Sequence, residues 1–310
     1  MTTPVEPTSG HGVVVVGSAN ADLVLRVADL PGPGETLLAT ATSRLPGGKG
    51  ANQAVAAARA GASTTLIGAI GDDADGRLVH DALAAAGVDV RTVRTSTVPT
   101  GVAVVLLDDR GQNSIVVAPG ANATIERLLP FERDVIGEAA VLLCQLEVPL
   151  PVIVEAAQVA RAAGRIVVVN AAPSQALPDV LVDAVDVLVV NEHEAREIAG
   201  TANLDRAVDE MLTRVPAVVV TLGESGARVA ERSGPHRRLP APAVHVVDTT
   251  GAGDTFCGVL AASLAGGESL AASAERAIAA ASISVQRLGA IPSIPDAAEI
   301  AAALTKAGMT

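Results

Sequence analysis

The segment VDTTGAGDTFCG, residues 247–258, places two aspartates around a glycine-rich turn that opens a helical stretch. Backbone N–H groups at the start of a helix lack intrahelical partners and carry a partial positive charge, so such turns attract phosphate. The carboxylates of Asp248 and Asp254 would repel a phosphate group. The two aspartates therefore need roles other than binding phosphate.

A second candidate site is the segment PGGKGANQ, residues 46–53. It is not a P-loop, because Ser43 stands where that motif requires its first glycine and Gly50 where it requires Ser or Thr. The glycines allow a close backbone approach to a small polar ligand, and Lys49 and Asn52 can donate hydrogen bonds to it. A lysine in a loop is ordinarily a solvated surface residue, but this chain has only one other lysine, which favours a functional Lys49.

Polar residues also follow several predicted strands, where ligands bind in open parallel sheets. Asn20 and Asp22 follow the first strand, although an Asx turn that merely closes the strand fits them equally well. Glu147 could accept hydrogen bonds from hydroxyl groups, or it could simply begin the next connection. Asn191 and Glu194, three residues apart, would suit magnesium bound through water, but an acidic first helical turn favoured by the helix dipole explains them as well.

Two further features of these segments bear on the site. His193 is expected on the surface, on another side of its helix from Asn191 and Glu194. The segment TLGESG, residues 221–226, is a strand followed by a turn of a size that suits a phosphate, and it does not fit the nucleophile-elbow spacing.

The composition restricts the function classes. A net charge of −12 argues against nucleic acid, and the chain has no Trp or Tyr and only two Phe for stacking on bases. Although 49% of the residues are hydrophobic, no uncharged run reaches the ~18 residues of a membrane span. The first residues have no signal-peptide pattern, and Cys144 and Cys257 are expected as buried free thiols rather than a disulfide. These observations predict a cytoplasmic protein with neither a nucleic-acid nor a membrane partner.

The elements that must position these residues alternate along the chain. Short Val/Ile/Leu runs predict buried strands at 13–17, 64–69, 140–146, 165–170, 185–191 and 217–222. Ala-rich segments between them predict helices at 51–60, 75–86, 150–163 and 205–214, followed by helices at about 252–266, 268–287 and 296–307. This alternation indicates an α/β fold with a mainly parallel, doubly wound sheet. Residues 23–45 and 100–117 alternate instead with period two, which predicts half-exposed antiparallel strands forming a small β lid.

In this order, the motifs resemble those of the ribokinase-type carbohydrate kinases of the phosphofructokinase-B superfamily. The resemblance runs from about residue 13 to 295 and includes both family signatures, GGKGANQAVAAARAG and VDTTGAGDTFCGVL. It implies one kinase domain over 1–310, a Rossmann-like αβα sandwich with a lid formed by about 20–48 and 98–120. It also implies a homodimer that forms through the lid.

The resemblance implies a role for each matching residue. The sugar would lie among Asn20, Asp22, Gly48, Lys49, Asn52, Glu147 and Asp254. ATP would lie against Asn191, Thr221, Gly223 and Gly226, with Glu194 and Asn191 organising Mg²⁺ through water. A monovalent cation, K⁺, would be held by Asp248, Thr250, Ser284, Arg287, Gly289 and Ser293, with backbone carbonyls contributed by Ser284, Arg287 and Gly289.

The implied activity is ATP-dependent phosphorylation of D-ribose at its 5-hydroxyl. Asp254 would take the hydroxyl proton as general base, while the N–H groups of Gly251, Ala252 and Gly253 stabilise the charge on the transferred phosphoryl group. Deoxyribose, fructose, a keto-deoxy acid or a nucleoside remain alternative substrates, the nucleoside disfavoured by the lack of an aromatic wall. A sugar-binding regulator without catalysis is a further alternative, although Asp254 and the glycine turn are both present.

Overall fold

The polar segments described above lie at one end of a large central sheet. The computed structural model describes residues 12–108, 110 and 112–307. In the described chain the central sheet has nine strands, in the order β13-β12-β11-β10-β9-β8-β1-β4-β5. Their bounds are β1 Val13–Val16, β4 Thr64–Gly71, β5 Val93–Ser96, β8 Val141–Cys144, β9 Ile166–Asn170, β10 Val187–Asn191, β11 Ala217–Thr221, β12 Ala227–Glu231 and β13 Arg237–Leu239.

The strands from β5 to β11 pair in parallel, and β12 and β13 add an antiparallel edge. The predicted mainly parallel sheet is confirmed. The short strands β5, β12 and β13 were not predicted, because polar residues such as Arg237 and Arg238 interrupt the apolar pattern in edge strands.

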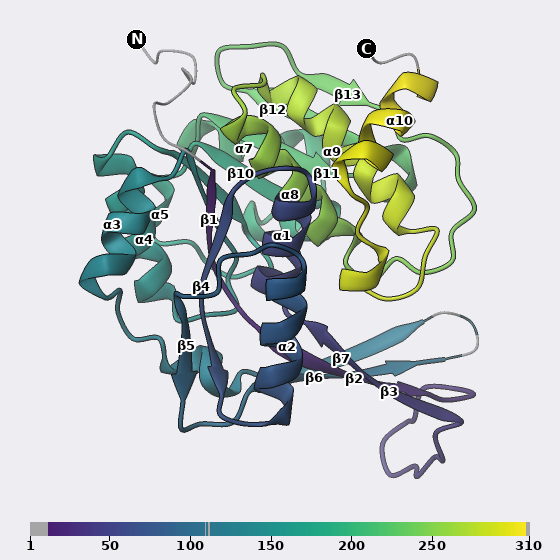
Figure 1. The fold of residues 1–310 in the computed structure, drawn as a ribbon. Helices are drawn as coiled ribbons and strands as arrows, with labels where there is room; N and C mark the ends of the chain where they lie inside the picture. The colour runs from purple at the N-terminus through teal and green to yellow at the C-terminus, as the bar shows by residue number, and fades with distance from the viewer. Residues whose placement is uncertain (1–11, 109, 111, 308–310) are drawn as a thin grey trace.

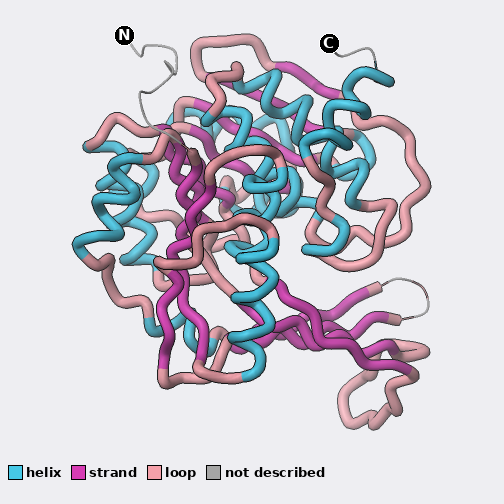
Figure 2. Tube along the Cα trace, in the orientation of Figure 1, coloured by secondary structure: helices cyan, strands magenta, loops and turns pink. Residues whose placement is uncertain are grey.

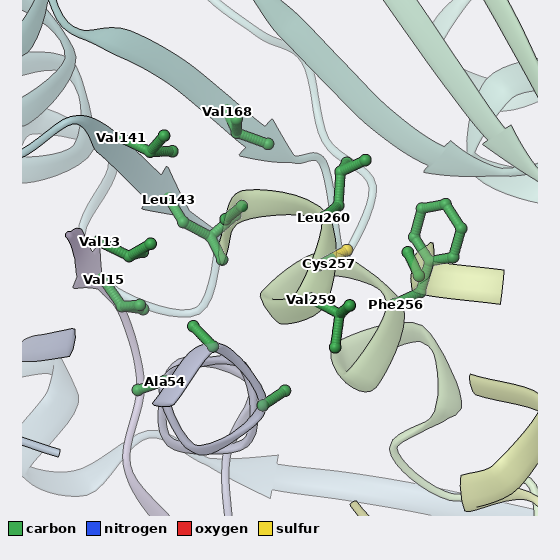
Figure 3. Close-up of a cluster of buried hydrophobic side chains, with 14 of the residues drawn as sticks. Val13, Val15, Ala54, Val141, Leu143, Val168, Phe256, Cys257, Val259 and Leu260 are labelled. Carbon is green, nitrogen blue, oxygen red and sulfur yellow. The ribbon is translucent and has the colours of Figure 1, made fainter. Parts of the chain in front are cut away.

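Helices cover both faces of this sheet (Figures 1 and 2). Successive residues of a strand point to opposite faces, so Val13 and Val15 pack into one core and Val14 and Val16 into the other. The first core, part of which Figure 3 shows, lies beneath α1 (Lys49–Arg59), α2 (Ala74–Ala85), α8 (Ala252–Ala265), α9 (Leu270–Ser284) and α10 (Ala297–Ala307). The second lies beneath α3 (Pro130–Glu138), α4 (Leu150–Ala162), α5 (Asp179–Val182), α6 (Glu192–Ile198) and α7 (Leu204–Arg214).

Helices α1 and α8, which carry the two signatures, lie in close contact within the first core. A side chain at Gly258 would collide with the backbone of Gln53 and lie 2.9 Å from the amide nitrogen of Ala57. Glycine at this position therefore lets the two helix backbones approach each other closely. This close approach brings the N-terminal turns of α1 and α8 together at the end of the central sheet where the polar segments lie.

The segments predicted to form a lid make a separate four-stranded sheet that projects from the core (Figure 1). Its strands are β2 (Asn20–Arg26), β3 (Ala41–Gly47), β6 (Gly101–Leu107) and β7 (Asn113–Ala118), in the order β3-β2-β6-β7. The predicted antiparallel pairing is right within β2–β3 and β6–β7 but wrong at the centre, where β2 and β6 pair in parallel. Both central strands run outward from the core and their hairpin partners return, so the two middle strands point the same way. Positions 109 and 111 of the predicted lid lie outside the described residues.

The two cysteines are free and buried, which confirms the predicted thiols. None of the described helices combines the length and apolar character that a bilayer-spanning helix needs.

Candidate functional site

Three carboxylates surround one lysine where the lid meets the core. Asp22 lies on β2, Glu147 follows β8, Asp254 lies on α8, and Lys49 begins α1. Burial raises the pKa of Asp22 from 3.8 to about 7, and the negative charges of Glu147 and Asp254 add to this rise. Asp254, opposed by burial and assisted by Glu147, raises the pKa of Lys49. The cluster therefore combines hydrogen-bond acceptors with a single positive charge, as a polyhydroxyl ligand requires.

Residues in the turn after β1 take part in the hydrogen bonds that hold Glu147 and Asn20 in place. Ser18 donates a hydrogen bond to Glu147 (2.6 Å), and the backbone N–H of Lys49 donates to the same carboxylate oxygen (3.3 Å). Asn122 receives the Ala19 N–H (2.9 Å) and donates its own amide to the Asn20 side chain (2.7 Å). Because both amide groups are buried, these bonds fix the direction in which Asn20 points.

Glycines make room for this arrangement. A side chain at Gly47 would overlap the carboxylate of Asp22, and one at Gly50 would lie 2.6 Å from the backbone of Gly17 and Ser18. Gly48 has a φ of 91°, which favours glycine. The glycines of the first signature therefore let the lid strand, the β1 turn and the start of α1 meet without side chains between them.

The start of α8, where the sequence predicts an anion site, is a glycine turn. Gly251 adopts a left-handed φ of 73°, and the N–H of Ala252 donates to the Thr249 carbonyl (3.2 Å). The N–H groups of Gly251, Gly253 and Asp254 have no hydrogen-bond partner among the described residues. The free donors therefore differ in part from those expected, because the turn itself occupies the N–H of Ala252.

Both oxygens of Asp254 are held from the side of α1. Asn52 Nδ2 donates to Oδ2 and Gln53 Nε2 donates to Oδ1, each at 2.9 Å. Asp254 is only 8% exposed, so these donors compensate a carboxylate that is largely removed from water. A fixed carboxylate beside free backbone N–H groups can accept a proton and stabilise an anion at the same place.

The other aspartate of the motif, Asp248, lies in a loop with Thr250 and Gly289. One of its oxygens accepts from the N–H (2.9 Å) and hydroxyl (2.6 Å) of Thr250, and the other accepts from the Gly289 N–H (2.8 Å). Burial opposes ionisation of Asp248, but these hydrogen bonds outweigh it and lower the pKa of the carboxyl. The structure thus brings three of the six predicted cation residues into direct contact.

The remaining predicted cation residues differ in their partners. Ser293 is buried and donates to the Ala290 carbonyl (2.7 Å), while Ser284 donates to the Ala281 carbonyl (2.9 Å). The guanidinium of Arg287 is paired with Glu299, so only the backbone of Arg287 could face a cation.

Asn191 and Glu194 form a capping box at the start of α6. The Asn191 side chain accepts the Glu194 N–H and the Glu194 carboxylate accepts the Asn191 N–H, both at 2.8 Å. Burial raises the pKa of Glu194, and the charge of Lys49 partly offsets this rise. Because each Glu194 oxygen can accept more than one bond, the cap leaves acceptor capacity on this carboxylate. His193 is exposed, as predicted.

The residues predicted to bind the nucleotide begin at the carboxyl ends of the neighbouring strands β10 and β11. Thr221 is the register partner of Asn191 between β10 and β11. Gly223 has a φ of 56° and faces open space, but a side chain at Gly226 would collide with Leu239 and the residues that follow it. The N–H of Gly226 is also occupied by the Gly223 carbonyl (3.0 Å). Gly226 therefore shapes the turn rather than offering a free donor.

Sequence reasoning missed the residues that support the charged ones. Ser18, Gln53, Asn122, Gln145 and Asn170 are all buried and hydrogen-bonded to the site or to each other. One signal was available, because a glutamine among the alanines of a core-facing helix is unusual and needs a partner. The partners of Gln53 are Gln145, Asn170 and Asp254, which lie 92, 117 and 201 positions away along the chain, so no local pattern identifies them.

Comparison with known proteins agrees with this geometry. The family model described as pfkB family carbohydrate kinase matches residues 11–297. Ribokinase from Arabidopsis thaliana is 38% identical over 297 residues, covering 92% of this chain and 78% of the relative. Ribokinase from Haemophilus influenzae is 38% identical over 291 residues, covering 91% and 95%. The structure of Arabidopsis thaliana ribokinase complexed with ribose and ATP superposes with a TM-score of 0.89 at 36% identity, covering 95% of this chain and 99% of that one.

The family model spans nearly the whole chain, and both signatures lie where their residues meet at one site. The chain therefore belongs to the pfkB family of carbohydrate kinases.

Proposed function

We propose that this protein transfers the γ-phosphoryl group of ATP to the 5-hydroxyl of D-ribose, with Asp254 as the general base. The observation that carries the proposal is the Asp254 carboxylate, fixed by two amides at 2.9 Å beside the free N–H groups of the α8 turn. Its relatives support the substrate, since ribokinases are similar over nearly their whole length and one is solved with ribose and ATP.

In this proposal the sugar lies against Asn20, Asp22, Gly48, Lys49, Asn52 and Glu147. Carboxylate and amide oxygens accept the sugar hydroxyls, and Lys49 donates to a sugar oxygen. Asp254 takes the proton as the 5-oxygen attacks phosphorus, and the α8 turn stabilises the negative charge on the phosphoryl group. The two phenylalanines of the chain, Phe131 on α3 and Phe256 in the first core, give no aromatic wall for a nucleobase, which favours a sugar over a nucleoside.

Nucleotide and magnesium would bind at the β10–β11 edge, against Asn191, Thr221 and the Gly223–Gly226 turn. Among the described residues no group of three or more His, Cys, Asp or Glu side chains could hold a metal directly. Glu194 keeps acceptor capacity within the electrostatic reach of Lys49, so it fits Mg²⁺ held through water. Magnesium would neutralise phosphate charge during transfer.

A monovalent cation, K⁺, fits the Asp248 loop. Asp248 supplies an ionised carboxylate that accepts the Gly289 N–H, and the backbone carbonyls of Ser284, Arg287 and Gly289 would supply neutral oxygens, the ligands that hard cations prefer. With the guanidinium of Arg287 turned to Glu299, no positive side chain of that residue opposes the cation. The bound cation would offset the charge of Asp248 near the anion turn.

The lid supports a homodimer. Ile115, Val116 and Val117 on its edge strand β7 are all exposed, as is Leu38 between β2 and β3. An exposed apolar edge strand is a surface that a second chain can cover. We place the enzyme in the cytoplasm, where reduced thiols such as Cys144 and Cys257 persist.

A coupled ADP-release assay tests the substrate. Purified protein, ATP and MgCl₂ are supplied with D-ribose, deoxyribose, fructose, a keto-deoxy acid or a nucleoside, with and without KCl. We expect ribose to have the highest kcat/KM, and the position of the phosphate is read by ³¹P and ¹³C NMR. Clear turnover of another substrate without turnover of ribose would refute the proposal, and no turnover of any would favour a binding protein.

A further inference from the structure

The catalytic carboxylate is connected to a chain of buried side-chain amides that reaches the centre of the sheet. Gln53 Nε2 donates to Asp254 Oδ1 (2.9 Å) and to Asn170 Oδ1 (3.1 Å), and Gln145 Nε2 donates to Gln53 Oε1 (2.6 Å). Asn170 in turn donates to the Val189 carbonyl (3.3 Å). The chain thus joins α8 through α1 to the carboxyl ends of β8 and β9.

The chemistry of the partners fixes the orientation of the Gln53 amide. A carboxylate can only accept hydrogen bonds, so the N–H₂ group of Gln53 must face Asp254. Its carbonyl oxygen then faces Gln145, which must present N–H₂ there. Gln145 Oε1 is left buried and without a partner among the described residues. An unpaired buried acceptor costs free energy. The protein nevertheless keeps the Gln53 amide in this orientation, which leaves Gln145 Oε1 unpaired.

Burial separates the tasks of the two amides that hold Asp254. Gln53 is 0% exposed, so the sugar cannot reach it, whereas Asn52 is 5% exposed and is proposed to contact the sugar. Gln53 holds Oδ1 from the core side. A carboxylate fixed in this way has less freedom to rotate about its side-chain torsions, and its second oxygen keeps a constant direction toward the ligand.

The fold provides for this contact with specific small residues. Gly258 lies one turn after Asp254, and any side chain there would collide with the backbone oxygen of Gln53. Any side chain at Gly17 would overlap Gln145 Oε1. The amide chain therefore depends on two glycines outside the charged cluster.

We infer that Gln53, oriented by Gln145 and Asn170, is a positioning residue that holds Asp254 in the geometry for proton transfer. The inference rests on the proposed role of Asp254 as the base. It assigns to Gln53 an effect on the chemical step and no direct contact with substrate.

The main test is Gln53→Met, which keeps a similar volume and removes both the N–H₂ donor and the carbonyl acceptor of the amide. Losing one hydrogen bond to a buried carboxylate should lower kcat by about 10- to 100-fold, while the ribose KM changes by less than about threefold. The matched control is Ser273→Ala on α9, which also removes a buried polar group. Unlike the Gln53 amide, the Ser273 hydroxyl has no hydrogen-bond partner among the described residues. The control should keep kcat, and thermal unfolding of both variants measures their stability.

A double-mutant cycle separates positioning from a general structural role. Adding Gln53→Met to Asp254→Asn should lower kcat no further than Asp254→Asn alone, because the group that Gln53 positions has already been changed. If Gln53→Met lowers kcat by the same factor in both backgrounds, it does not act through Asp254. If Asp254→Asn loses activity and Gln53→Met alone keeps the normal kcat, the positioning role is refuted and the proposed function stands. A normal kcat in Asp254→Asn would refute the base itself.

Where Gln53→Met shows no cooperative unfolding, Gln53→Glu replaces it. This variant keeps the size and the acceptor for Gln145, but once ionised it has no donor for Asp254. We expect a low kcat at pH 8 and partial recovery at lower pH, where the introduced carboxyl takes up a proton and can donate again. A kcat that stays normal after the introduced carboxyl has ionised would overturn the inference.

Discussion

Asp22 links the stability of the protein to pH. Its pKa is raised from 3.8 to about 7, first by burial and then by the charges of Glu147 and Asp254. A carboxyl whose pKa is raised by folding contributes stability that is complete below the unfolded pKa and is lost as the pH rises through the folded pKa. Stability should therefore fall between about pH 4 and pH 7, where the carboxyl of Asp22 is ionised in the unfolded chain but still protonated in the folded cluster.

The size of this effect follows from the shift. A rise of about three units, at ~1.4 kcal/mol per unit, corresponds to a loss of about 4 kcal/mol once Asp22 is fully ionised. Integrated between pH 5 and pH 8 alone, the same two pKa values give about 2 to 3 kcal/mol. In Asp22→Asn this position stays neutral, so the variant should be more stable than the native protein at pH 8, and the difference should be smaller at pH 5.

Thermal unfolding without sugar or nucleotide, recorded at intervals from pH 5 to pH 8, measures the prediction. The Tm of Asp22→Asn should exceed that of the native protein by an amount that grows by roughly 5 °C over this range. Asp134→Asn on α3, where the aspartate is exposed, is the control and should follow the native curve. Parallel Tm curves for Asp22→Asn and the native protein would refute the reasoning.

Three further results are expected. Gly258→Val should lower the free energy of unfolding by about 3 kcal/mol or more in thermal or urea unfolding, because the side chain would collide with Gln53. The control Gly266→Ala, at the end of α8, should change it little, and equal Tm values for the two variants would contradict the close packing of α1 and α8. Replacing KCl with tetramethylammonium chloride should slow turnover, and Asp248→Asn should abolish the difference; equal rates of the native enzyme in both salts would exclude the cation site. Val116→Glu should convert a dimer to a monomer in light scattering with the monomer fold retained, and a dimer that persists would exclude β7 from the interface.

The sequence predicts the parts of this protein whose partners are close in the chain. Parallel strands and helices follow from local apolar patterns, and the left-handed turn at Gly251, the proposed anion site, follows from glycines beside a helix start. The rarity of lysine in this chain points to Lys49, which lies among three carboxylates.

The features that the sequence does not predict join residues that are far apart in the chain. The parallel pairing of β2 with β6 cannot be inferred from alternation, which has the same period in parallel and antiparallel strands. Gln53 meets Asp254 only because α1 and α8 pack closely at Gly258, a contact between residues more than two hundred positions apart. A local pattern identifies each of these residues as unusual but does not say which others it meets.

Helix α1 explains why one signature stays contiguous although the site it serves is assembled from distant segments. At its start, Lys49 and Asn52 face the carboxylates, and one position later Gln53 faces the core. At its other end, Arg59 donates to the carbonyls of Ile291 and Ile294 (both 2.8 Å), which flank Ser293 in the loop next to Asp248 and Gly289. A rigid helix of three turns thus fixes the distance between the proposed sugar end of the site and the candidate cation loop. An insertion within α1 would shift Lys49 and Asn52 relative to Arg59. The number of residues between them is therefore set by the distance between the two parts of the site that they contact.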